Sequence, residues 1–97
     1  MERRLGIVAI VIEDQSSVPR VNALLTDSAD IIDARLGLPM RGKGISLISL
    51  VVEGDTDRVG SLTGRLGKLA GVKVKSVLTG YRESAADPAP DSDRESP

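Results

Sequence analysis

Histidine and cysteine are both absent from this 97-residue chain, as are phenylalanine and tryptophan. Without His or Cys side chains, the chain cannot form the usual zinc, nickel or copper sites, and it cannot use these residues in acid–base or nucleophilic catalysis. The lack of cysteine also excludes disulfides and fits a reducing compartment, so a cytoplasmic location is expected. We therefore predict no metal, no cofactor and no enzymatic activity.

The chain also lacks a large excess of either positive or negative charge. Residues 1–81 carry 11 basic and 9 acidic side chains, whereas residues 82–97 carry 2 and 5. Neither part resembles a strongly charged nucleic-acid or membrane surface. The apolar run near the start ends at Glu13 and Asp14 without a cleavage site, so we interpret it as a strand and not as a signal peptide. No segment is long enough to cross a bilayer, and no membrane partner is expected.

The last sixteen residues contain no large apolar side chain. Such a segment cannot bury enough surface to offset the entropy lost on ordering. We therefore predict a single domain over residues 1–81 and a disordered acidic tail over residues 82–97.

Hydrophobic patterning predicts four strands and two helices in the order βαββαβ. Residues 4–13 and 45–53 are apolar at both parities, which is typical of strands covered on both faces. Residues 30–38 and 72–78 mix polar and apolar side chains, which is typical of edge strands. One helix is expected after a cap at Ser16 or Ser17, and the other between a cap at residues 55–56 and a stop at Gly71.

These central and edge strands predict an α+β, ferredoxin-like fold: an antiparallel four-stranded sheet in the order 4-1-3-2, with two helices on one face. The other face is then bare, although the central strands are apolar on both faces. A soluble monomer rarely exposes such a patch, so we predict a homo-oligomer, either a dimer or a dimer of dimers. RNA-binding sheets of this shape need aromatic side chains on the central strands, so we predict no direct nucleic-acid binding.

Three glycines lie on one line of the predicted second helix. Gly60, Gly64 and Gly67 fall within about 60° of one another, well apart from the apolar stripe of that helix. Each glycine costs about 1 kcal/mol relative to alanine in a helix interior, which indicates a close approach by another group. Thr63 lies between the two stripes. The approaching group is either the chain's own backbone, a second subunit or a ligand.

A second candidate site is basic. Arg35, Arg41 and Lys43 lie near the predicted hairpin at residues 39–44, whose glycine amides can help to bind an anion. The alternative is a solvated hairpin tip. Three aspartates at positions 27, 30 and 33 can hold a hard cation in principle, but helix caps and solvated strand residues explain them more simply.

Several segments together resemble one small family. They are residues 21–25 (VNALL), 30–32 (DII), 35–39 (RLGLP), 60–69 (GSLTGRLGKL) and 71–75 (GVKVK). The chain resembles, over residues 4–79, the regulators of the iron-only hydrogenase system, which are ACT-like domains also grouped with the C-terminal domain of nickel-responsive regulators. The resemblance implies a ferredoxin-like, oligomeric regulatory domain associated with hydrogenase maturation. Nickel-regulator relatives use His and Cys and a separate DNA-binding domain, and this chain has neither, so those functions do not carry over.

The residues and the resemblance lead to one hypothesis and two alternatives. We expect a non-enzymatic, ACT-like regulatory module that self-associates and binds a small-molecule ligand or a protein partner. A structural scaffold protein without a ligand is the first alternative. A small carboxylate-dependent enzyme is the second.

Overall fold

The computed structural model describes residues 2–84. The strands are β1 (Glu2–Ile12), β2 (Ile32–Met40), β3 (Ile45–Gly54) and β4 (Val72–Ser84), and the helices are α1 (Val18–Asp27) and α2 (Thr56–Gly67). Three short 3-10 turns join them: η1 (Gln15–Ser17), η2 (Ala29–Ile31) and η3 (Arg41–Lys43). No helix within this described part is long and apolar enough to cross a membrane.

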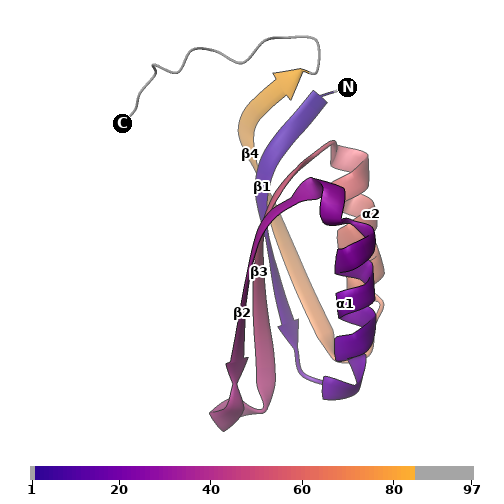
Figure 1. Ribbon diagram of the computed structural model, residues 1–97, viewed down its shortest axis with the longest axis vertical. Helices are drawn as coiled ribbons and strands as arrows, with labels where there is room; N and C mark the ends of the chain where they lie inside the picture. The colour runs from indigo at the N-terminus through magenta and orange to yellow at the C-terminus, as the bar shows by residue number, and fades with distance from the viewer. Residues whose placement is uncertain (1, 85–97) are drawn as a thin grey trace.

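The four strands form one antiparallel sheet in the order β2-β3-β1-β4. Both helices lie on the same side of this sheet (Figure 1). The order is the predicted 4-1-3-2 read from the opposite edge, so the ferredoxin-like βαββαβ prediction is confirmed. The strands predicted to be central, β1 and β3, pair with each other and occupy the middle of the sheet.

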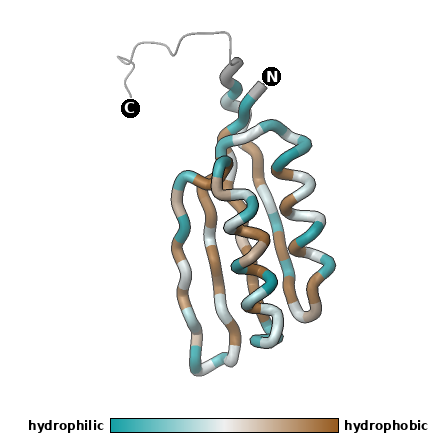
Figure 2. Tube along the Cα trace, turned by 45° about the vertical axis from the view of Figure 1, so that its right-hand side comes forward, coloured by the Kyte–Doolittle hydropathy of each residue, from teal (hydrophilic) through white to brown (hydrophobic). Residues whose placement is uncertain are grey.

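The core fills the space between the sheet and the helices. Figure 2 shows apolar segments, in brown, along the strands as well as the helices. Burying one such side chain fully is worth about 1.5–3 kcal/mol, so an aliphatic core can hold a domain that has no Phe or Trp. Its buried members are Val8, Ile10, Ile12, Val21, Leu25, Ile31, Ile48, Leu50, Val52, Val59, Leu62, Leu66 and Val72.

The connection into α1 uses its polar residues differently from the prediction. Ser17 occupies the N-cap position of α1, as predicted, but its side chain makes no capping bond. Its buried hydroxyl instead donates to the backbone oxygen of Ala70, at 2.6 Å. Asp14 caps the preceding turn, since its carboxylate accepts from the backbone N–H of Ser16. The serine thus joins the start of α1 to the loop after α2.

Gly71 belongs to the same junction. Its φ of +66° lies in the left-handed region, which side chains with a Cβ rarely adopt. A Cβ at this position would also lie 2.5 Å from the Cβ of Asp14. The backbone N–H of Glu13 donates to the Gly71 oxygen at 2.6 Å. The predicted stop after α2 is therefore also the place where two loops pack against each other.

Strand β4 runs to Ser84, beyond residue 78, where the predicted strand ends, and beyond residue 81, where the predicted domain ends. Its last residues pair with the start of β1: Arg4 lies opposite Arg82 and Glu2 opposite Ser84. An irregularity in register between Arg4 and Gly6 separates this end from the rest of the β1–β4 ladder. Most of the predicted tail, residues 85–97, lies outside the described residues.

Two truncations separate the end of the strand from the tail. Removing residues 85–97 should leave the melting temperature unchanged within about 1 °C, because that segment has no large apolar side chain to bury. Removing residues 82–97 also deletes the last β1–β4 pairs. The loss of their hydrogen bonds, about 0.5–1.5 kcal/mol each, should lower the melting temperature by about 5–10 °C. Equal melting temperatures for the two truncations would contradict a fold that ends at Ser84.

Candidate functional site

The face of the sheet away from the helices is apolar and exposed. Ladder partners lie on the same face, and the outer-face pairs between the two central strands are Ile7–Val51, Ala9–Ser49 and Val11–Leu47. The register with the edge strands adds Leu36, Leu38 and Val77. We call these nine residues the outer face. Exposed fractions reach 69% at Leu36 and 62% at Val77, so residues 2–84 leave these large apolar side chains uncovered.

Charges lie around the outer face and not at its centre. Lys73 and Lys75 are on the β4 side, opposite Val11 and Ala9. Lys73 lies 3.5 Å from the carboxylate of Glu13. At one end of the sheet, the guanidinium of Arg3 donates to the backbone oxygen of Glu53 at 2.7 Å. An apolar centre with a charged rim is the usual composition of a protein–protein interface.

The glycine line of α2 points into open space. Apart from neighbouring residues and the backbone of α2 itself, no heavy atom of residues 2–84 lies within 4 Å of a Cβ built at Gly60 or Gly64, and a Cβ at Gly67 would only make ordinary contact with Val74, at 3.5 Å. The hydroxyl of Thr63 donates to the backbone oxygen of Gly60 at 3.1 Å. Packing against the chain's own backbone therefore does not explain Gly60 or Gly64. A contact there with a second subunit or a ligand stays a prediction.

Arg35 lies apart from the hairpin tip with which it was predicted to act. Its guanidinium donates to the side-chain oxygen of Asn22 on α1 at 2.8 Å. Arg35 is paired with the buried Leu50, so it lies on the helix side of the sheet. About 17 Å of extended strand separate it from Met40 at the start of the turn. The structure thus does not bring Arg35 together with Arg41 and Lys43.

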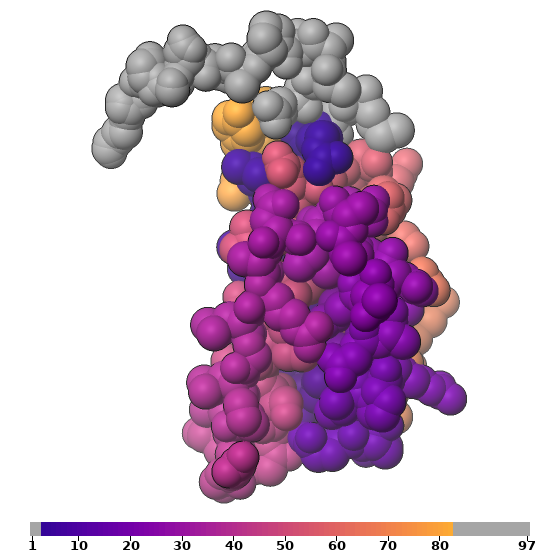
Figure 3. Space-filling view, in the orientation of Figure 1, coloured from indigo at the N-terminus to yellow at the C-terminus, as the bar shows by residue number. Residues whose placement is uncertain are grey.

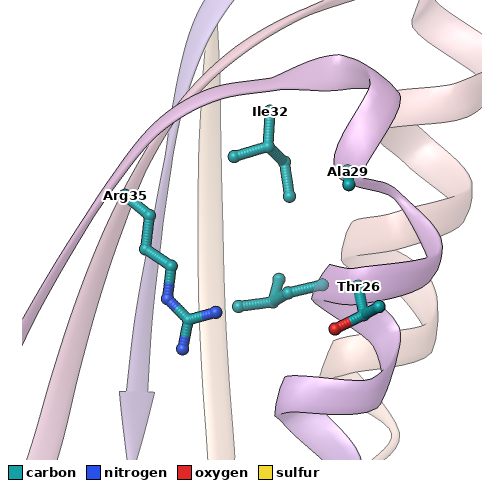
Figure 4. Close-up of a pocket in the computed structure, with 5 residues that line it drawn as sticks. Thr26, Ala29, Ile32 and Arg35 are labelled. Carbon is teal, nitrogen blue, oxygen red and sulfur yellow. The ribbon is translucent and has the colours of Figure 1, made fainter.

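A small cavity lies beside Arg35. It has a volume of about 250 Å³ and is lined by Leu25, Thr26, Ala29, Ile32 and Arg35. Figure 4 shows the Arg35 guanidinium directed from β2 toward α1, across from Thr26. The space-filling view shows the neighbouring surfaces of α1 and β2 along this seam (Figure 3). The polar groups of the cavity are already engaged, because the Thr26 hydroxyl donates to the Asn22 backbone oxygen at 3.0 Å.

Arg41 and Lys43 lie together on the exposed turn η3 at the hairpin tip. Gly44 ends this turn with a φ of +69°. Arg41 lines a shallow cavity of about 300 Å³ with Gln15, Pro39, Gly44, Ile45 and Ser46. Two of the three predicted anion-binding side chains are therefore close together, on a solvated tip.

The three aspartates considered as cation ligands have a different arrangement. The guanidinium of Arg58 binds both carboxylate oxygens of Asp30, at 2.7 and 2.9 Å. These hydrogen bonds lower the pKa of the Asp30 carboxyl from its usual value. The pair therefore stays ionised at neutral pH, and any stability it adds is lost as the pH falls through that lowered pKa. Among residues 2–84, no three acidic side chains come together as a metal site.

Sequence reasoning missed two hollows beside α1. One is the cavity at Arg35. The other is a groove of about 330 Å³ between α1 and α2, lined by Arg20, Ala23, Leu24, Arg65, Lys68 and Leu69. The sequence contains a signal for the groove, because an arginine in each helix, Arg20 or Arg65, is followed four residues later by a leucine, Leu24 or Leu69. Its meaning depends on how the two helices lie relative to each other.

The two-layer fold with its uncovered apolar face defines a ferredoxin-like α+β module. Residues 4–76 match the TM1266-like family model, described as "Iron-only hydrogenase system regulator, putative". The chain belongs to this family, which confirms the resemblance found in the sequence. No curated protein matches the chain significantly.

One solved structure agrees with this assignment, and two others share only the fold. The uncharacterized protein TM1266 from Thermotoga maritima is 36% identical, with a TM-score of 0.76 over 78% of this chain and 96% of that one. A formyltetrahydrofolate deformylase from Pseudomonas putida KT2440 shares the fold at 12% identity, with a TM-score of 0.59 over 79% of this chain and 29% of that one. An unknown protein from Galdieria sulphuraria has 11% identity and a TM-score of 0.56, over 81% and 46% of the two chains.

Gly64→Ala tests the glycine line. The chain leaves room for the methyl group, so the substitution should stabilise the isolated subunit by up to about 1 kcal/mol through helix propensity. If a second subunit or a ligand lies against the line, the same methyl group should weaken assembly or ligand binding. Thermal melting and light scattering on one sample measure both effects.

Ser61→Ala is the matched control, because Ser61 is exposed on the same helix and outside the glycine line. It should leave assembly unchanged. A Gly64→Ala protein that is more stable and fully assembled would remove the contact role from the line.

Proposed function

We propose that this protein is a non-enzymatic, ACT-like regulatory module of the iron-only hydrogenase system that acts as a homo-oligomer in the cytoplasm. Family membership supports the regulatory class. The observation that carries the proposal is the outer face, whose exposed aliphatic side chains need a cover. A second copy can supply it through a symmetric contact in which the same patch serves both subunits.

The geometry favours a face-to-face pair. Sheets stacked in this way lie about 10 Å apart, with their side chains interdigitated. The outer face is aliphatic at the central strands, where two copies would meet, and its lysines are at the β4 side. The described part of the chain has no bare apolar helix face of comparable size, because α1 and α2 direct their apolar stripes into the core.

The module regulates through what it binds, either a small-molecule ligand or a protein partner. Candidate contacts are the glycine line with Thr63, the Arg35 cavity, and the Arg41–Lys43 tip. Native mass spectrometry of protein purified from its own host reports the oligomer mass and any retained ligand together. A ligand-free oligomer that also retains no partner would favour the scaffold alternative.

The link to hydrogenase is tested in the cell. In a host that carries an iron-only hydrogenase, deleting the gene should change the amount or the activity of matured hydrogenase. The wild-type gene should restore it, and a variant that cannot self-associate should not. Unchanged hydrogenase after deletion would contradict the regulatory role.

Val51→Lys tests the outer face. Val51 lies on the central strand β3 of this face and is 39% exposed, so a lysine can extend to water in a monomer. In a face-to-face pair it would bring two like charges together in an apolar contact, which should weaken dimerisation by about tenfold or more. Sedimentation or light scattering at micromolar concentration measures the change, and circular dichroism checks folding.

Leu36→Lys is a second variant for the same face, because Leu36 is already 69% exposed and tolerates charge in the monomer. Gln15→Lys adds the same charge on the exposed turn η1 and should have no effect. A wild-type protein that is strictly monomeric, or two outer-face variants that associate as well as wild type, would refute the proposed interface.

A further inference from the structure

The groove between α1 and α2 has an apolar floor and a basic rim. Ala23 and Leu24 from α1 and Leu69 beyond the end of α2 form the floor. Leu24 and Leu69 are half-buried and pack on the core beneath. The rim consists of Arg20 on one helix and of Arg65 and Lys68 on the other. The two leucines of the floor are therefore fixed by the core, while the side chains of the rim are exposed and can contact another molecule.

The rim charges have no charged partner among the described residues. The side chains of Arg20, Arg65 and Lys68 make no ion pair and donate no hydrogen bond within residues 2–84. Other basic residues do have partners in the same structure, such as Arg35 with Asn22 and Arg58 with Asp30. No acidic side chain lines the groove. Three positive charges thus border an apolar strip without compensation.

Helix stability does not explain Arg20. It is the third residue of α1, close to the positive end of the helix dipole, where a cation is unfavourable. The first turn of α1 contains no acidic residue. In contrast, α2 begins in the expected way, with Asp55 as its N-cap and Asp57 in its first turn. The position of Arg20 therefore points to a role outside α1.

We propose that this groove binds an acidic, amphipathic helix of a partner protein. A helix of about three turns laid between α1 and α2 would place apolar side chains on Ala23, Leu24 and Leu69. Its flanking carboxylates would meet Arg20 on one side and Arg65 and Lys68 on the other. The groove deepens the proposed function by naming a partner class, yet it lies on the helix layer, so it can fail independently of self-association.

Other occupants fit the groove less well. A small molecule in a dedicated site is usually buried over most of its surface, whereas this groove lies open between two helices. A nucleic-acid backbone or an anionic membrane matches the charges but makes no specific use of an apolar strip between them. The chain's own segment 85–97 is acidic, but it contains prolines and no large apolar residue that would fill the floor.

A display library of helical peptides of about 14 residues provides the probe. The floor-facing positions vary among Leu, Ala and Ser, and the flanking positions vary among Glu, Lys and Ser. The full-length protein should enrich peptides with leucine on one face and glutamate beside it. Peptides recovered in this way should bind more weakly as salt increases, because the rim charges are exposed to solvent.

Charge reversal identifies the binding surface. Arg20→Glu combined with Arg65→Glu should weaken an enriched peptide by about tenfold or more, because both flanks then repel it. Thr56→Glu is the control, because it adds a negative charge at the exposed start of α2, outside the groove and the other candidate contacts, and it should stay within about twofold of wild type. Light scattering should show the same oligomer for all variants.

Each other outcome overturns the proposal. No enrichment, enrichment of basic helices, or affinity insensitive to the Arg20 and Arg65 reversals would refute a helix-binding groove. Inorganic phosphate, single-stranded DNA and vesicles containing phosphatidylserine are tested in parallel. Tighter rim-dependent binding to one of these than to the enriched peptide would assign the groove to that ligand instead. Loss of peptide binding in Val51→Lys would contradict a groove that binds independently of the dimer contact.

Discussion

Two central strands that are apolar on both faces dominate this structure, because two helices can cover only one face of their sheet. Val8, Ile10 and Ile12 of β1 face the helices and are essentially fully buried. On the opposite face of the same strand, Ile7 remains 43% exposed. The domain is too small to bring a third layer from its own described residues. Its hydrophobic pattern is therefore complete only if another molecule supplies that layer.

The hydrophobic pattern predicted the strand order of the sheet because central and edge strands differ in their local composition. The strands that are apolar at both parities proved to be central, and the strand with Lys73 and Lys75 proved to be an edge. The ends of the helices and strands were harder to predict from the sequence. The extension of β4 to Ser84 depends on pairing with Glu2–Arg4 across a register irregularity, and nothing within residues 79–84 marks it as a strand. Distant pairing sets the end of β4.

The candidate sites show the same limit. Arg35 was grouped with Arg41 and Lys43 because they are close in sequence, yet strand parity turns Arg35 toward α1 and Asn22. The glycine line was visible from helical spacing, but only coordinates show that it faces open space. The inter-helix groove requires the relative placement of two helices whose groove-lining residues are more than forty positions apart along the chain. Sites made by one element are predictable from sequence, whereas sites made by two are not.

The two layers of the domain have different proposed roles: the sheet binds a second copy, and the helix layer binds a partner. If the outer faces of two copies meet, their helix layers point away from each other on the two outer surfaces of the pair (Figure 1). Each groove then remains open, and one helical segment cannot reach both. Such a pair would carry two partners, one on each surface, at equal numbers of subunits and partners. A partner with two linked acidic helices would instead join successive pairs into chains. Because the groove lies on the helix layer, away from the outer face, only partners that offer a single helix each would form a closed complex with the pair.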